Sequence, residues 1–246
     1  MRQGTPVRLA MWSGPRNIST AMMRSWGNRP DTFVCDEPLY AHYLKVTGKP
    51  HPGAAEIIAQ YENDWRRVVD RLTGEIPEGK AIFFQKHMAH HLLPGLGRDW
   101  LHDVTNCFLI RDPREMLTSL LKILPEPRIE DTGLPQQVEI FELVRSRTGA
   151  VPPVLDARDV LDNPRALLGR LCELVGVDFD EAMLSWPPGR RETDGLWARD
   201  WYHEVEKSTS FRPYAVKSDE LPPRFADLCG RCVECYARLA AHRLRA

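Results

Sequence analysis

The sequence predicts a three-layer α/β fold, in which helices cover both faces of a central, mostly parallel β-sheet. Short apolar runs that suit buried strands alternate along the chain with segments of helical period. The strand-like runs are almost continuously apolar, which is typical of parallel sheets covered on both faces. The composition, 43% hydrophobic and 27% charged over 246 residues, is that of a folded globular chain.

The predicted strands are short and separated by turn signals. They cover residues 7–12, 32–35, 81–85, 107–110 and 153–156. The first leads into the turn SGPRNIS, and the fourth into Arg111-Asp112-Pro113. There Asp112 suits a helix N-cap and Pro113 the first helical position, so a helix is expected to follow.

The predicted helices fill the intervals between these strands. They cover residues 20–26, 54–72, 115–124, 138–146, 165–175 and 228–244. Apolar residues from Ile57 to Leu72 keep the helical period, which predicts one continuous helix over 54–72. The helix at 165–175 opens at Asn163-Pro164 and ends at Gly176, a typical C-terminal glycine.

Length and charge set limits on organisation and partners. No shift in composition marks a boundary, so residues 1–246 are expected to form one domain, with a core at about 7–180 and a helical C-terminal part at about 181–246. Without a signal peptide or an apolar run of 18 residues, we expect a cytoplasmic chain that does not enter a membrane. The net charge of −1 gives no indication of a nucleic-acid partner, and the oligomeric state stays open.

The six cysteines are expected to be free thiols. Cys229, Cys232 and Cys235 have a spacing that also occurs in iron–sulfur ligation. On a helix, however, the same spacing puts Cys232 and Cys235 on one apolar stripe with Leu228 and Leu239. The interpretation we favour is a buried helix face, because a free cysteine packs as a small hydrophobe.

The first strand-to-helix junction has the features of an anion site. Backbone N–H groups at a helix N-terminus bind phosphate or sulfate, and Arg16, Ser19 and Thr20 add a charge and two hydroxyl groups there. The phosphate loop of ATPases, G-x-x-x-x-G-K-[ST], is absent, as is the dinucleotide fingerprint G-x-G-x-x-G. Magnesium-dependent nucleotide chemistry and dinucleotide binding are therefore not indicated.

This loop resembles the phosphosulfate-binding loop of sulfotransferases that use 3′-phosphoadenosine 5′-phosphosulfate (PAPS). Bacterial members commonly have P-R-S-G-S-T, and four of six positions match in Pro15-Arg16-Asn17-Ile18-Ser19-Thr20. The resemblance implies a P-loop NTPase-like sulfotransferase architecture, with residues 16–20 holding the 5′-phosphosulfate. Asn17 and Ile18 depart from the pattern, and a β-branched residue does not readily adopt a positive φ.

A second motif of the same family places an arginine at a strand end and a serine eight residues later. Arg111 and Ser119 have this spacing, and the resemblance implies that they bind the 3′-phosphate of PAPS. The planar guanidinium suits phosphate oxygens. The alternative is that Arg111 pairs locally with Asp112. Both motifs would lie at the carboxyl edge of a parallel sheet, where ligands of such folds bind, and the resemblance covers residues 7–180.

The resemblance also implies catalytic residues after the second strand and at the end of the third. Glu37 lies where several relatives keep a catalytic base, and Asp36 would raise its pKa by like-charge repulsion; the alternative is a capping or ion-paired carboxylate. Lys86 matches a family lysine that would neutralise the oxygen bridging phosphate and sulfate. His87, one residue earlier than the family histidine, would be a base, an acceptor-site donor or structural.

Other candidate groups have two interpretations each. His87, His90 and His91 have a spacing that on a helix ligates zinc, but no nearby cysteine or carboxylate completes a set, so no metal is expected. An aromatic cluster in the C-terminal part would belong to the core or to an acceptor pocket; it comprises Trp186, Trp197, Trp201 and Tyr202. Residues expected near the adenosine are Ser208, Thr209 and Phe211.

Together these features predict an enzyme, a PAPS-dependent sulfotransferase. It would move a sulfuryl group to a hydroxyl or amine of a small-molecule, carbohydrate or lipid acceptor, with PAPS as co-substrate and no metal. Two alternatives stay open. One is a phosphotransferase on the same scaffold, and the other is an inactive nucleotide-binding or partner-binding module, which Ile18 favours.

Overall fold

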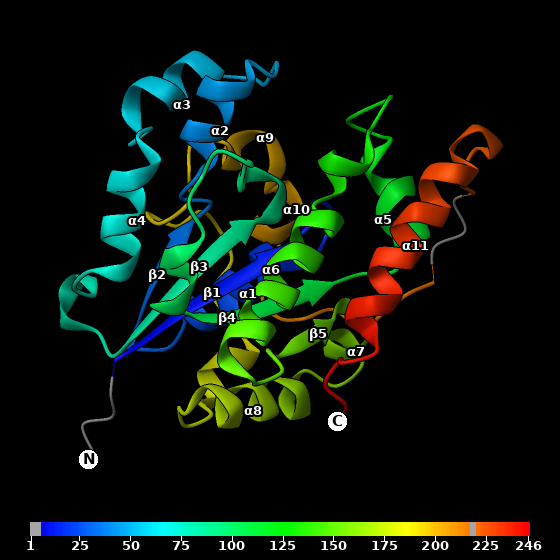
Figure 1. Ribbon diagram of the computed structural model, residues 1–246. Coiled ribbons are helices and arrows are strands. Elements are labelled where there is room, and N and C mark those ends of the chain that lie inside the picture. The colour runs from blue at the N-terminus through cyan, green and yellow to red at the C-terminus, as the bar shows by residue number, and fades with distance from the viewer. Residues whose placement is uncertain (1–5, 217–219) are drawn as a thin grey trace.

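A five-stranded sheet forms the centre of the computed structural model, which describes residues 6–216 and 220–246. The strand order is β2–β3–β1–β4–β5, and every pairing is parallel (Figure 1). The predicted α/β fold with a parallel sheet is confirmed, and each predicted strand forms. The strands are β1 (Val7–Ser13), β2 (Thr32–Asp36), β3 (Ile82–Met88), β4 (Thr105–Ile110) and β5 (Val154–Asp156).

Helices cover both faces of this sheet. They are α1 (Ser19–Gly27), α2 (Tyr40–Thr47), α3 (Ala54–Gln60), α4 (Trp65–Thr73), α5 (Pro113–Leu120), α6 (Leu134–Thr148), α7 (Ala157–Asp162), α8 (Pro164–Val175), α9 (Ala198–Trp201), α10 (His203–Glu206) and α11 (Ala226–Ala240). Side chains of a strand point alternately to its two faces. In β1, Leu9 and Met11 pack in the cluster that includes α1 and α8, whereas Ala10 and Trp12 pack in the cluster that includes α4 and α6.

The prediction of one helix over 54–72 is wrong, because the chain breaks between α3 and α4. Tyr61 is extended, with φ −106° and ψ 153°. The Asp64 side chain accepts a hydrogen bond of 2.9 Å from the backbone N–H of Arg66, which starts α4. Asn63 donates from its side chain to the Ile58 carbonyl at the end of α3. These short polar side chains compete for backbone groups, and they outweigh the apolar period.

The predicted caps of α5 and α8 are confirmed. Asp112 accepts a hydrogen bond from the backbone N–H of Glu115, and Pro113 begins α5, which ends at Leu120 rather than at residue 124. Asn163 caps α8 in the same way, and Gly176 follows it with φ 78°. Helices α2 and α7 were not predicted. The α7 helix starts directly at the end of β5, where Asp156 is its N-cap.

Helix α11 packs one face, which carries two of its three cysteines, against the rest of the fold. Cys229, Cys232 and Leu239 are buried, and α11 contacts α5 and α6 (Figure 1). All six cysteines are free thiols, as predicted. Within residues 6–216 and 220–246, no helix combines the length and the apolar character needed to cross a membrane.

Candidate functional site

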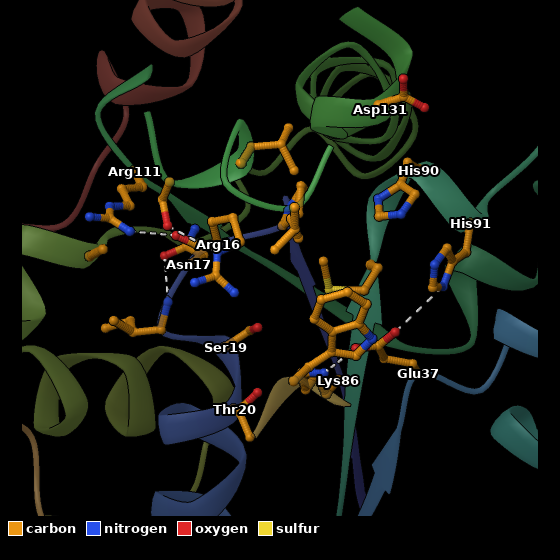
Figure 2. Close-up of a pocket in the computed structure, with 18 of the residues that line it drawn as sticks. Arg16, Asn17, Ser19, Thr20, Glu37, Lys86, His90, His91, Arg111 and Asp131 are labelled. Atoms are coloured by element: carbon orange, nitrogen blue, oxygen red, sulfur yellow. Dashed lines mark hydrogen bonds and ion pairs between the residues drawn. The ribbon is translucent and has the colours of Figure 1, made fainter. Parts of the chain in front are cut away.

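A cavity of about 2000 Å³ opens at the carboxyl edge of the sheet, and the ends of several strands contribute to its wall. Residues 15–18 follow β1, Glu37 follows β2, Lys86 belongs to the last part of β3, and Arg111 follows β4. Figure 2 shows the predicted loop and Arg111 on one side, with Lys86 and Glu37 opposite. Of the residues predicted for catalysis and for binding the two anionic groups of PAPS, all line this cavity except His87. The residues brought together are Arg16, Asn17, Ile18, Ser19, Thr20, Glu37, Lys86, Arg111 and Ser119.

The loop after β1 takes a path that its sequence can adopt. The left-handed conformation falls on Arg16, with φ 56°, whereas Ile18 has φ −90° and ψ 20°. The β-branched Ile18 therefore does not conflict with this loop path. Gly14 is required for a different reason, because a Cβ atom there would lie 2.3 Å from the carbonyl oxygen of Thr132.

The start of helix α1 supplies hydrogen-bond donors to the cavity. The Asn17 side chain fixes the turn, donating to the Leu109 carbonyl at 2.9 Å and accepting from the Ile18 N–H at 2.8 Å. Ile18, at the N-cap, gives no side-chain bond to the first turn, which holds no acidic residue. Ser19 and Thr20 in that turn line the cavity. The turn therefore combines hydroxyl groups, unshared backbone N–H groups and the positive end of a helix dipole.

Two arginines meet at this end of the cavity. The Nε of Arg16 donates to the Ser119 hydroxyl at 3.0 Å, and Arg111 Nη1 donates to the Arg16 carbonyl at 2.5 Å. Arg111 pairs with Glu115, at 2.9 Å, rather than with Asp112. Burial lowers the pKa of Arg16, and the charge of Arg111 lowers it further. An anion between the two guanidinium groups would relieve that repulsion.

Lys86 anchors a buried network at the other end. Its Nζ donates to Asp36 at 2.8 Å, to Glu37 at 2.5 Å and to the Tyr202 hydroxyl at 2.8 Å. The Tyr202 hydroxyl donates in turn to Asp36. The Lys86 side chain is only 1% exposed, and burial alone would lower its pKa. The two carboxylates prevail and raise the pKa of Lys86 well above its usual value.

Glu37 is held in a left-handed backbone conformation, with φ 43°. Its N–H donates to the Lys86 carbonyl at 2.9 Å, and its own carbonyl accepts from the Tyr40 N–H at 3.0 Å. Burial raises the pKa of Glu37; Lys86 opposes this shift, and Asp36 adds to it. Asp36 thus raises the pKa of Glu37, as predicted, but burial raises it more. Glu37 is therefore better suited to take a proton than an exposed glutamate.

His87 points to the opposite face of β3 from Lys86. Its ring stacks on Trp12 at 4.2 Å, and its Nε2 lies 3.2 Å from the Gln85 side-chain oxygen. Burial, with a contribution from Lys86, lowers the pKa of His87 to about 3. The structure does not bring His87 to the cavity, because successive residues of a strand alternate between faces. Of the predicted roles for His87, these contacts favour the structural one.

The three histidines do not share a helix, so the spacing argument for a zinc site fails. His87 is in β3, whereas His90 and His91 belong to the single turn Ala89–His91. Among the residues that the structure describes, no group of three or more His, Cys, Asp or Glu side chains is arranged to hold a metal ion.

His91 lines the cavity beside Glu37, a role that the sequence did not predict. Its ring is stacked on Tyr40, with 4.6 Å between centroids, and its Nδ1 lies 4.0 Å from Glu37 Oε2 (Figure 2). Tyr43, His90 and His51 line the same part of the cavity. The one available signal was a pair of histidines shortly after a buried strand, which does not distinguish a cavity wall from a core position.

The aromatic cluster of the C-terminal part divides between core and cavity. Trp186 and Trp197 are buried, whereas Trp201 and Tyr202 line the cavity. Of the residues expected near an adenosine, Ser208 and Phe211 line the cavity and Thr209 does not. The backbone carbonyl of Thr209 instead accepts from the Trp186 N–H at 2.9 Å.

Comparison with known families identifies the chain. A family model described as "Sulfotransferase domain" matches residues 7–227. The chain belongs to this sulfotransferase family. The matched segment includes all five strands and every predicted site residue. The family assignment therefore covers the whole edge of the sheet at which the cavity opens.

Two curated relatives come from Arabidopsis thaliana. "Branched-chain-amino-acid aminotransferase-like protein 2" is 35% identical over 232 residues, which is 94% of this chain and 41% of the relative. "Branched-chain-amino-acid aminotransferase-like protein 1" is 34% identical over 238 residues, 96% of this chain and 42% of the relative. This sulfotransferase domain thus spans about two fifths of the length of the curated relatives it matches.

One solved structure shows the same fold. The sulfotransferase domain of the Synechococcus PCC 7002 olefin synthase superposes with a TM-score of 0.53 at 15% identity, covering 96% of this chain and 97% of that one. A sulfotransferase from Alicyclobacillus acidocaldarius has a TM-score of 0.49 at 13% identity, with 98% of both chains covered. At these identities the similarity concerns the fold alone.

Proposed function

We propose that this sulfotransferase domain transfers the sulfuryl group of PAPS to a hydroxyl or amine of a small acceptor. The observation that carries the proposal is the layout of one cavity. Arg16, Arg111 and Ser119 meet at one end, and Glu37 with Lys86 lies at the other. A donor with two anionic groups and an acceptor that must lose a proton need these two kinds of surface in one space.

The hydrogen-bond donors at the arginine end of the cavity suit a phosphosulfate and a phosphate. Arg16 and Arg111 supply two guanidinium groups, and burial and the charge of Arg111 lower the pKa of Arg16. Ser19 and Thr20 add the first-turn groups of α1. Fixed donors and arginine forks of this kind bind tetrahedral oxyanions. Arg16 would hold the 5′ end, and Arg111 with Ser119 the 3′-phosphate.

The chain's own residues supply what the transfer needs. Glu37 takes the proton of the acceptor hydroxyl while the acceptor oxygen bonds to sulfur. Lys86 and Arg16 stabilise the negative charge that grows on the phosphate oxygen as the bond from sulfur to that oxygen breaks. Tyr202 and Asp36 hold Lys86 Nζ beside Glu37, at 2.8 Å from each of them. The broken bond leaves its electron pair on the phosphate of 3′-phosphoadenosine 5′-phosphate (PAP).

Ligand stabilisation tests the nucleotide half of this proposal. The shift of the unfolding temperature is measured with PAP and with ATP plus Mg²⁺, on the wild type and on Arg111→Ala. The matched control is Arg238→Ala, which removes an exposed arginine on α11 paired with Glu142. PAP at about 100 times its Kd adds roughly 2.7 kcal/mol to the stability of the native state. We expect this gain in the wild type and the control, and its loss in Arg111→Ala.

Transfer itself is tested with ³⁵S-labelled PAPS and a panel of phenols, sugars, hydroxylated lipids and amines. Formation of labelled acceptor by the wild type but not by Glu37→Gln supports the proposal. Stabilisation by ATP with Mg²⁺ but not by PAP would favour the phosphotransferase. PAP binding without transfer to any acceptor or to water would favour the inactive module.

A further inference from the structure

Three histidines that line the cavity, His51, His90 and His91, each have a buried Nδ1 atom without a hydrogen-bond partner among the described residues, and that of His91 lies nearest Glu37. The His91 side chain is 3% exposed, and its Nδ1 makes no hydrogen bond within residues 6–216 and 220–246. A buried polar nitrogen in this state has lost its hydrogen bonds to water without gaining a replacement. Stacking on Tyr40, with an interplanar angle of 4°, fixes the ring so that this nitrogen faces Glu37.

The gap between His91 and Glu37 matches one oxygen atom. His91 Nδ1 and Glu37 Oε2 are 4.0 Å apart, which is too far for a direct hydrogen bond. An oxygen about 2.8 Å from each would bridge them with an angle of roughly 90° at the oxygen. A hydroxyl group in that place donates to the carboxylate and accepts from an imidazole N–H.

The surroundings of the two groups separate their roles. Burial lowers the pKa of His91 well below its usual value, and the histidines at 87, 90 and 51 and Lys86 add to that shift. His91 is therefore neutral and keeps a single N–H. Glu37 is the nearby carboxylate, and burial raises its pKa. The two neighbouring groups are therefore suited to different roles, the carboxylate to accepting a proton and the neutral imidazole to donating a hydrogen bond.

We propose that His91 is a second catalytic residue, which donates a hydrogen bond from Nδ1 to the acceptor oxygen while Glu37 removes the proton of that oxygen. The inference rests on the proposed sulfuryl transfer and adds a residue to it. The acceptor O–H proton moves to the Glu37 carboxylate, the acceptor oxygen forms its bond to sulfur, and the bond from sulfur to the phosphate oxygen breaks. His91 gives up no proton. Its hydrogen bond orients the acceptor oxygen so that a lone pair of this oxygen points at sulfur.

Two variants separate the hydrogen bond from the packing of the ring. His91→Asn places a side-chain N–H close to the position of Nδ1, whereas His91→Leu removes the donor. Water serves as the acceptor, so the assay is the release of labelled sulfate from ³⁵S-PAPS by the full chain. We expect His91→Leu to lower the rate about 100-fold and His91→Asn to stay within tenfold of the wild type, with PAP affinity unchanged in both. His42→Asn, a half-buried histidine outside the cavity, is the control.

The tautomer of His91 gives a readout that does not depend on turnover. Nitrogen NMR of the PAP-bound chain labelled at histidine, assigned with His91→Asn, is expected to show the proton on Nδ1. A proton on Nε2 would overturn the inference, as would wild-type sulfate release in His91→Leu. If the wild type fails to bind PAP, the proposed function falls and this inference with it. PAP binding with sulfate release that is insensitive to His91 overturns the inference alone.

Discussion

Removing the charge of Lys86 is expected to destabilise the fold strongly. Lys86→Met keeps an unbranched apolar side chain but leaves Asp36, 1% exposed, and Glu37 without their shared cation. Breaking a buried pair by removing one partner costs about 3–5 kcal/mol. That is a large part of the roughly 5–15 kcal/mol by which domains are stable.

The separation of the charges supports this magnitude. At 2.8 Å between Lys86 Nζ and Asp36 Oδ1, the attraction is about 6 kcal/mol in a medium of effective dielectric constant near 20. The variant recovers the several kcal/mol that desolvation of the ammonium group had cost. The attraction lost minus the desolvation cost recovered is consistent with the lower part of the range of about 3–5 kcal/mol. The lost attraction to the second carboxylate, Glu37, increases the expected destabilisation.

The loss is also expected to depend on pH. Burial already raises the pKa of Glu37, and without Lys86 that pKa rises further. A carboxyl group whose pKa is higher in the folded state than in the unfolded state stabilises the fold at low pH, and this contribution is lost as the pH rises through the folded pKa. The difference between Lys86→Met and the wild type should therefore be larger at pH 8 than at pH 5.

Urea unfolding followed by tryptophan fluorescence at pH 5, 6.5 and 8 measures these values. Lys45→Met is the matched control, because Lys45 is exposed and its Nζ contacts Asn63 outside the cavity. Adding Asp36→Asn to Lys86→Met should restore part of the loss, since one unpaired carboxylate is gone. If Lys86→Met and Lys45→Met differ by less than about 0.5 kcal/mol at every pH, a size typical of surface substitutions, the buried charge network does not stabilise the fold.

Three further changes test the same site. Tyr202→Phe removes a hydroxyl that donates a hydrogen bond to Asp36 at 2.8 Å. This change should lower the free energy of unfolding in urea by about 1–2 kcal/mol, and it should slow sulfate release from PAPS without changing the affinity for PAP. A loss of PAP affinity would contradict this. Glu37→Gln should abolish sulfate release. It should also stabilise the fold, more at pH 8 than at pH 5, because it removes a carboxylate whose pKa burial raises. Lower stability of the variant than of the wild type at pH 8 would contradict this. Gly14→Ala should abolish the thermal shift with PAP, because its Cβ would lie 2.3 Å from the Thr132 carbonyl oxygen and displace the loop; an unchanged shift would show that the loop tolerates the displacement.

Local sequence signals predicted the frame of the site well. Apolar runs located all five strands, and Asp112 and Asn163 marked helix starts that the structure contains. In a parallel sheet the carboxyl ends of the strands share one edge. For that reason, motifs as far apart as Arg16 and Arg111 could be expected in one place, and the two are joined by a hydrogen bond.

The phase of β3 could not be predicted, and it decides between two histidines. The strand-like run is at residues 81–85, with Lys86 and His87 expected at the end of the strand. It continues to Met88, so Lys86 and His87 alternate to opposite faces. The chain then turns, and His91 comes to lie beside Glu37 instead. Because β3 continues to Met88, His91 rather than His87 reaches the cavity.

Contacts over long separations left no local signal at all. Tyr202 bonds to Lys86 across 116 residues, and the Gly195 N–H donates to Asp36 across 159. Aromatic residues near 200 suit a core as well as a cavity, so composition does not distinguish the two. The hydrogen bonds of Tyr202 to Lys86 in β3 and to Asp36 in β2 place it in the charge network.

Backbone strain at the cavity falls on two of the residues whose side chains do the proposed work. Arg16, in the loop after β1, and Glu37, directly after β2, both have positive φ, 56° and 43°. For residues other than glycine such a conformation costs of order 1 kcal/mol, and it persists where the surroundings enforce it. Arg111 bonds to the Arg16 carbonyl, and Lys86 accepts from the Glu37 N–H, so groups from neighbouring strands impose each turn. The sheet that aligns the strand ends therefore also fixes the directions in which its charged side chains leave it.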